Sequence, residues 1–126
     1  MKFTVAVKRR FIARHYLIGG DWGDENDVHS HEYGVEVSLE GTQLNEHGYV
    51  ADIAEIGARV DGIIAGVKEK TLNDLDEFSG LNPSVERLAA LFCRSLLTKI
   101  APGISAVRVR VFEDDGAWAA CRREIP

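Results

Sequence analysis

Hydrophobic and polar residues alternate along two stretches near the start of the chain. In residues 3–17, and again in residues 32–40, the apolar side chains fall mostly on odd positions. An alternation with a period of two is typical of a half-buried β-strand, because successive side chains of a strand point to opposite faces. The sequence therefore predicts two strands, joined by an acidic, glycine-rich loop over residues 19–27. The first strand is long enough that we expect a bulge near residues 8–10.

Two later stretches carry apolar residues at spacings of three and four, which is the period of an amphipathic α-helix. We expect the first helix to have Asp52 as its N-cap and to end near Lys70. We expect the second to have Asn82 as its N-cap and Pro83 as its first helical residue, and to stop at residues 102–103. Each apolar stripe must be buried against another part of the chain.

The last part of the chain returns to strand-like alternation. Valines at positions 107, 109 and 111 alternate with arginines, and Asp115–Gly116 is a hairpin signal before a final strand over residues 117–122. The order ββααββ predicts an α+β fold in which a four-stranded antiparallel sheet carries both helices on one face. At 126 residues, we expect a single domain over residues 1–126. Such a sheet has two open edges, which several copies could protect by closing into a barrel.

Composition narrows the classes of partner and the cellular setting. With 15 basic and 20 acidic residues the net charge is -5, so nucleic acid is not an expected partner. No stretch approaches the roughly 20 apolar residues that cross a bilayer, and no membrane association is expected. The two cysteines, Cys93 and Cys121, lie far apart and lack metal-ligand spacing. They indicate a reducing, cytoplasmic setting and are best interpreted as buried apolar residues.

Three histidines have the spacing of metal ligands. His29 and His31 are two positions apart at the start of the second predicted strand, so both rings emerge on the same face. That face is the apolar one, and His15 shares its parity on the first strand, so a hairpin would bring the three rings together. Three histidines with a fourth position open are a recurring catalytic zinc arrangement. On spacing alone, hydrogen-bonded histidines of the core or a loop remain the alternative.

A longer set of motifs resembles the family of 6-pyruvoyl tetrahydropterin synthase and 6-carboxytetrahydropterin synthase. Residues 11–17 resemble its F-x-A-x-H-x-L strand, and residues 29–33 resemble its H-G-H-x-Y stretch, with Ser30 in place of the usual glycine. Both stretches carry the zinc histidines of the family. Further matches follow in order: G-x-V-x-D-F at residues 48–53, L-N-D-L at 72–75, N-P-T-x-E at 82–86 and V-x-V-x-E at 109–113.

The resemblance implies a fold, a metal and a ligand class. The fold is the tunnelling fold, in which trimers form a barrel and stack as hexamers, and a pterin or similar heterocycle binds at subunit boundaries. His15, His29 and His31 would hold Zn²⁺. Glu113 occupies the position where a carboxylate accepts hydrogen bonds from the amino group and ring N–H of the pterin. Ser84 stands where the family often has a threonine near the heterocycle, although a hydroxyl in a first helical turn also caps helices.

The chain departs from the family where protons are transferred. Glu25 stands where synthases usually carry a cysteine, and Lys68 and Glu69 replace their Asp-His pair. Some members of the family that this chain resembles have glutamate at the first position and remove the side chain of dihydroneopterin-type substrates, so Glu25 could be a general base. Alternatively, Glu25 is one acid of a solvated loop. Lys68 and Glu69 could replace the lost pair, or could be an ordinary solvated charge run.

Together these features predict a zinc-dependent, lyase-type enzyme that acts on a pterin or related heterocycle, with Glu25 as the catalytic residue. The usual catalytic Cys and Asp-His pair are missing. A non-catalytic protein that binds zinc and the heterocycle is the first alternative, and an enzyme for an unrelated ligand is the second.

Overall fold

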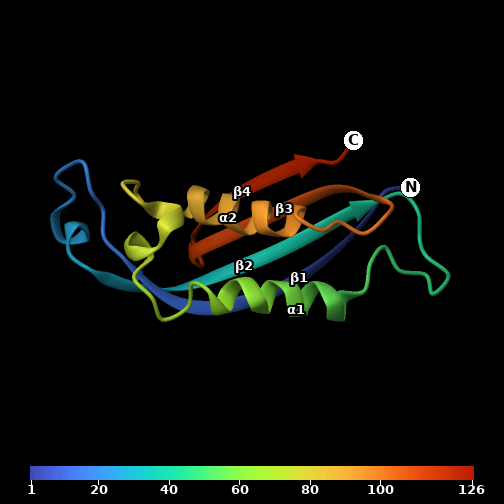
Figure 1. Cartoon of the computed structure of the whole chain (residues 1–126), viewed down its shortest axis with the longest axis horizontal. Coiled ribbons are helices and arrows are strands. Elements are labelled where there is room, and N and C mark those ends of the chain that lie inside the picture. The colour runs from blue at the N-terminus through green and yellow to red at the C-terminus, as the bar shows by residue number, and fades with distance from the viewer.

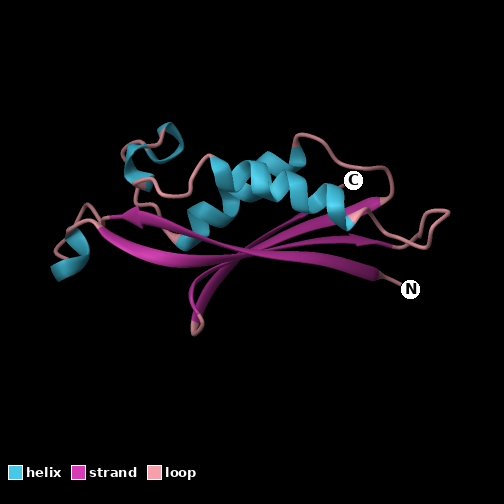
Figure 2. Cartoon of the chain, turned by 90° about the horizontal axis from the view of Figure 1, so that it is seen from below, coloured by secondary structure: helices cyan, strands magenta, loops and turns pink.

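One antiparallel sheet supports the whole molecule in the computed structural model, which describes residues 1–126. Its strands lie in the spatial order of the chain (Figure 1): β1 (Phe3–His15), β2 (His29–Gly41), β3 (Ile104–Asp114) and β4 (Ala117–Glu124). Two helices, α1 (Ile53–Ala65) and α2 (Val85–Leu97), cover one face (Figure 2). Three 3-10 helices complete the chain: η1 (Gly23–Asn26), η2 (Leu72–Asp74) and η3 (Asp76–Phe78). The predicted ββααββ order and α+β class are confirmed.

The hydrophobic core lies between the sheet and the two helices. Val37 on β2 and Val109 on β3 are register partners and are fully buried. The helices contribute Val60 from α1 and Leu88 from α2, which are equally buried. The odd-numbered strand positions therefore form the buried face, as the alternation predicts. Neither helix is long and apolar enough to span a membrane.

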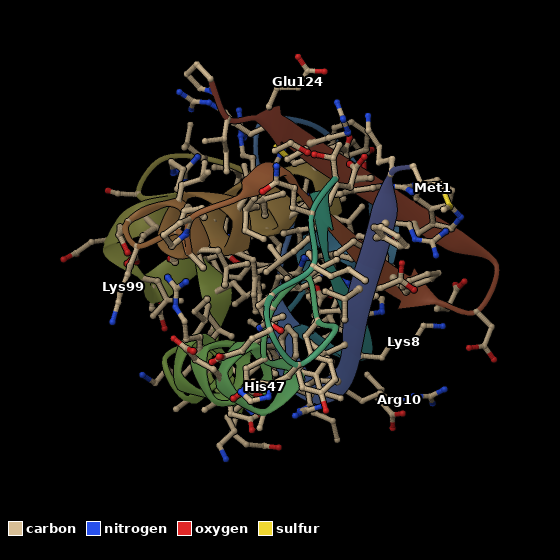
Figure 3. All side chains as sticks on the ribbon, turned by 90° about the vertical axis from the view of Figure 1, so that its right-hand side faces the viewer. Met1, Lys8, Arg10, His47, Lys99 and Glu124 are labelled. Atoms are coloured by element: carbon tan, nitrogen blue, oxygen red, sulfur yellow. The ribbon has the colours of Figure 1, made fainter.

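The opposite face of the sheet carries charged side chains and no helix. Arg110 donates to Glu36 at 2.9 Å, and Arg122 donates to Glu40 at 2.9 Å across the strands. The hydrogen bond from Arg122 lowers the pKa of the Glu40 carboxyl. Figure 3 shows Lys8 projecting from this face, away from the helices. The charges on this face are paired across the strands, and Glu36 is buried at 9% exposure, so the face contributes ion pairs and not apolar packing.

The predicted bulge in the first strand is wrong. β1 pairs with β2 without interruption from Phe3 opposite Gly41 to His15 opposite His29. Arg9 explains the error, because it holds a buried-face position although it is charged. Its Nε donates to the Asp61 carboxylate of α1 at 2.9 Å, so an ion pair fills that position and the alternation continues.

Helix α1 begins as predicted but ends early. Asp52 is the N-cap, and its carboxylate accepts from the main-chain N–H of Ala54 at 2.9 Å. The helix ends at Ala65, not near Lys70. Gly66 is the C-cap, and the chain then turns over residues 66–69, where Glu69 adopts a positive φ of 58° and donates its main-chain N–H to the carbonyl of Ile12 on β1. This turn covers part of the outer edge of β1.

Helix α2 begins two residues later than predicted. The N-cap is Ser84, whose hydroxyl oxygen accepts from the main-chain N–H of Arg87 at 3.2 Å. Asn82 is not the cap, because its side-chain amide is bonded instead to the main chain of Ile18. Asn followed by Pro is a common helix start, and only the distant partner distinguishes this case.

Candidate metal centre

Three imidazoles meet at the end of the sheet where β1 ends and β2 begins. His15 lies opposite His29 in the strand register, and His31 lies opposite Ala13, so all three occupy the helix-covered face. Their ring centroids are 4.5 to 4.9 Å apart, and one ligand nitrogen of each lies within 4.8 Å of the others. The sequence predicted from their odd-numbered positions that these three histidines share one face, and the structure brings them together there. They form a group that could hold a metal ion.

Main-chain carbonyls orient two of the rings. His15 Nδ1 lies 3.1 Å from the carbonyl oxygen of Pro83, and His29 Nδ1 lies 2.8 Å from that of Asp27. A carbonyl oxygen only accepts, so each Nδ1 carries the ring proton. The lone pair is then left on Nε2. A hydrogen bond from the far ring nitrogen is the usual support of a histidine metal ligand.

The free nitrogens of this cluster fit a metal ion. His29 Nε2 and His31 Nε2 are shielded from solvent and have no hydrogen-bond partner. A buried polar atom without a partner is costly, and a cation that accepts nitrogen ligands would remove that cost at both positions. Burial lowers the pKa of His15, with smaller contributions from His29 and His31 in the same direction, which favours the neutral form that binds metals.

An acid and a phenol adjoin the histidines. Glu113 Oε1 lies 3.1 Å from His31 Nε2, although the pair is out of line for a hydrogen bond. The Tyr33 hydroxyl lies 3.4 Å from His15 Nδ1, and burial, followed by the Glu113 carboxylate, raises the pKa of Tyr33. Glu113 has no partner in either strand ladder, since β3 carries it as an extra residue between Phe112 and Asp114. Such bulges are frequent beside functional sites.

Glu25 lies in η1, beyond the end of the sheet (Figure 2). Its main-chain carbonyl accepts from the N–H of Leu17 at 2.8 Å, which ties η1 to the segment that follows His15. The carboxylate itself is exposed and makes no hydrogen bond or ion pair within the chain. The structure thus brings the loop of Glu25 to the histidine end and leaves its side chain in solvent.

The other candidates fall into two groups. Ser84 adjoins Pro83, the residue that orients His15, but its hydroxyl already caps α2. Lys68 and Glu69 lie in the turn along the β1 edge, where the Glu69 carboxylate is 3.9 Å from Arg14. Lys68 and Glu69 therefore lie outside the histidine cluster.

The orienting groups were not visible in the sequence. Every residue has a carbonyl, so no residue type marks Pro83 or Asp27 as a partner of a histidine. Tyr33 carried a signal, because it shares the parity of the histidines in the stretch of residues 29–33. Asn82, in the motif of residues 82–86, was also marked by the sequence, but we interpreted it as a helix cap.

Comparison with known proteins decides the family. Residues 4–124 match the family described as 6-pyruvoyl tetrahydropterin synthase. The chain belongs to this family. It is 31% identical over 123 residues to an Archaeoglobus fulgidus protein provisionally named 6-carboxy-5,6,7,8-tetrahydropterin synthase, covering 97% of each chain. It is 28% identical over 103 residues to dihydroneopterin monophosphate aldolase of Pyrococcus furiosus, covering 82% of each. Membership of the family and these relatives point to a pterin-related enzyme.

The fold has solved counterparts. The structure of 6-pyruvoyltetrahydropterin synthase from Plasmodium vivax, in a variant whose catalytic glutamate is replaced by alanine, matches with a TM-score of 0.82. The match covers 99% of each chain at 15% identity, so it shows the shared tunnelling fold alone.

Neither thiol belongs to the histidine cluster. Cys93 is buried on α2, where burial, and then the thiol of Cys121, raise its pKa to about 11. Cys121 on β4 is the register partner of Val109, away from Glu113 along β3. Both cysteines belong to the packing between α2 and the sheet.

Proposed function

We propose that this chain is a zinc-dependent lyase that cleaves the side chain of a dihydroneopterin-type substrate. The observation that carries the proposal is the cluster of His15, His29 and His31, with two shielded Nε2 atoms that lack partners, in a chain of this family. Three neutral imidazoles and an open fourth position suit Zn²⁺. The relative named dihydroneopterin monophosphate aldolase supports cleavage over the usual synthase reaction.

The metal and the chain have separate tasks in this proposal. Zn²⁺ held by the histidines would polarise a side-chain oxygen of the substrate. Glu113 would fix the heterocycle, because a carboxylate can accept from an amino group and a ring N–H at once. Its position 3.1 Å from His31 would place the bound ring beside the metal ligands. Ser84 is a second candidate contact to the ring, from the start of α2.

Glu25 is the proposed general base. It would remove the proton of a hydroxyl on the substrate side chain, whereupon the adjacent carbon–carbon bond breaks. The outer fragment leaves as an aldehyde, and the carbon attached to the ring gains a proton, so that a 6-hydroxymethyl group remains. No oxidant or water is consumed. Two facts support this role: η1 is bonded to Leu17, close to His15, and the Plasmodium vivax synthase has a catalytic glutamate.

A product assay tests the proposal. The zinc-loaded protein is incubated with 7,8-dihydroneopterin and with its monophosphate and triphosphate, and the products are analysed by mass spectrometry. We expect a 6-hydroxymethyl pterin and an aldehyde fragment. Little or no pyruvoyl or carboxy tetrahydropterin should form, because the thiol and the Asp-His pair are absent. Abundant synthase products would contradict the proposal.

Two variants separate Glu25 from its neighbours. Glu25→Gln should lower turnover by about 100- to 10,000-fold, the usual contribution of a general base, while zinc and ligand binding persist. Asp24→Asn is the matched control, because Asp24 is an exposed acid of the same 3-10 helix. Unchanged turnover in Glu25→Gln would remove Glu25 from the mechanism.

A non-catalytic function is the second candidate. The observation that favours it is the exposed Glu25 carboxylate, together with the loss of the Asp-His pair at positions 68 and 69. In that case the protein would bind zinc and a pterin, measured by calorimetry, and release the pterin unchanged.

We also propose that the chain assembles as a trimer or hexamer. β4 is an open edge, and the helix-free face of the sheet exposes 49% of Trp118. Closing a barrel across subunits would pair the edges and cover that face. Light scattering at micromolar concentration is the test, and a stable monomer would contradict both the assembly and a pocket shared between subunits.

A further inference from the structure

Two asparagine side chains hold the segment that leaves β1. Asn73 Oδ1 accepts from the main-chain N–H of Tyr16 at 3.0 Å, and its Nδ2 donates to the Tyr16 carbonyl at 2.9 Å. Asn82 repeats this pairing at Ile18, accepting at 2.7 Å and donating at 3.1 Å. Because each amide matches both a donor and an acceptor, its orientation is fixed by its partner. The two side chains act as a substitute for a neighbouring strand, since they pair with alternate residues.

Leu17, between Tyr16 and Ile18, forms its main-chain hydrogen bonds on the opposite side, with the loop of Glu25. Leu17 donates its N–H to the Glu25 carbonyl at 2.8 Å, and the Leu17 carbonyl accepts from Asn26 Nδ2 at 3.0 Å. Residues 16–18 are therefore bonded on both sides, by the asparagines on one side and by η1 on the other. The asparagines need not contact η1 directly, because both are bonded to the main chain of residues 16–18 and a shift of that segment would move η1 as well.

The same connection adjoins the histidine cluster. His15 directly precedes the bonded segment, and Pro83, which orients the His15 ring at 3.1 Å, directly follows Asn82. One side of the network thus fixes a metal-ligand candidate, and the other fixes the loop that carries the proposed base. A shift of residues 16–18 would change the distance between them.

We infer that Asn73 and Asn82 are positioning residues that set the place of Glu25 relative to the histidine cluster. The catalytic part of this inference rests on the proposed function, whereas the structural part does not. It assigns a role to Asn73, which the sequence matched only to a family motif, and to Asn82, which the sequence wrongly predicted as a helix cap. Neither asparagine is a catalytic residue, since both act through the main chain of Tyr16 and Ile18.

Asparagine-to-aspartate changes test the inference with little change of shape. In Asn82→Asp and Asn73→Asp the carboxylate can still accept from the main-chain N–H, but it cannot donate and it faces a carbonyl oxygen. Asn45→Asp is the matched control. Asn45 lies in the loop between β2 and α1 and uses only its Oδ1, to accept from the N–H groups of His47 and Tyr49, so aspartate should preserve both bonds.

Amide hydrogen exchange at Leu17 gives a readout that does not depend on activity. We expect exchange of the Leu17 N–H to accelerate by about tenfold or more in Asn82→Asp and in Asn73→Asp, and to stay unchanged in Asn45→Asp. Exchange of core amides on β2 and zinc content should match the wild type in all three. Unchanged Leu17 exchange in both aspartate variants would overturn the inference. If one variant fails to fold, the other decides the outcome.

Turnover then tests whether the network acts through Glu25. Asn82→Asp should lower kcat by about tenfold with little change in KM, and it should have no further effect in a Glu25→Gln background. An equal loss of kcat in both backgrounds would show that Asn82 does not act through Glu25. A failure of the proposed function is recognised separately, because Glu25→Gln would then leave turnover unchanged while the Leu17 exchange result still stands.

Discussion

The centre and the histidine end of the helix-covered face are both built on β1 and β2. They differ in what their buried side chains require. At the centre, Val7 lies opposite Val37, and packing against the helices buries Val37 completely. At the end, His15 lies opposite His29 at positions of the same parity. There, packing leaves shielded Nε2 atoms without partners. Burial alone satisfies a valine, whereas a buried imidazole also requires a polar partner.

This difference separates stability from function within one face. The centre should determine whether the sheet and helices stay together, and the histidine end should determine what the protein binds. Each region can then be disturbed without the other, and the following experiments use that separation.

Loss of the histidines should have the largest effect. The wild type should bind about one Zn²⁺ per chain, and the double variant His29→Ala/His31→Ala should bind none at zinc concentrations that saturate the wild type. Metal analysis after gentle purification and zinc titration measures this. His47→Ala is the control, since His47 is exposed in a distant loop. A wild type that neither contains nor binds zinc would contradict the metal site.

A cavity at the centre should have the converse effect. Val37→Ala should lower the free energy of unfolding by about 2 kcal/mol, because it removes buried methyl groups from a packed site. Urea denaturation measures the loss. Zinc content of the folded variant should match the wild type. A variant that loses zinc while remaining folded would show that the two regions are coupled.

A change of Glu113 should act on the ligand alone. Glu113→Gln should weaken binding of a pterin by about tenfold, because the amide matches one of two ring donors poorly, and zinc binding should persist. Calorimetry with a pterin measures the change. Glu124→Gln, at the exposed end of β4, is the control. A pterin found elsewhere than at Glu113 in a soaked crystal would contradict this role.

Acidification should show a smaller effect at the histidine end. Burial lowers the pKa of His15 below 6.5, so the unfolded chain binds more protons than the folded one as the pH falls below that value. The metal-free protein should therefore lose stability between about pH 6.5 and 5, and the zinc-bound protein should lose more over the same range, because zinc binds the deprotonated histidines and is released as they are protonated. Thermal unfolding of the wild type and His15→Gln measures it. An identical pH dependence in the two would contradict this assignment.

Much of this comparison could be predicted from the sequence. Alternation and helical periodicity predicted the strands, the helices and the buried face, and parity placed the three histidines on it. The errors have one physical cause, which is contact between distant residues. Arg9 reaches Asp61, and Asn82 reaches Ile18, so neither the bulge nor the helix cap that local patterns favour is formed. The carbonyls that orient the rings could not be predicted, because they depend on the fold and not on residue type.

The asparagine pairing also bears on the chemical durability of this end of the molecule. An asparagine ages by deamidation when the main-chain nitrogen of the next residue attacks its side-chain carbonyl carbon and ammonia is released. Asn82 precedes Pro83, which has no N–H, so this route is closed. Asn73 precedes Asp74, whose N–H already donates to the Thr71 carbonyl at 3.0 Å. Conversion to aspartate by this route, the change that would disconnect residues 16–18, is therefore blocked at Asn82 and hindered at Asn73.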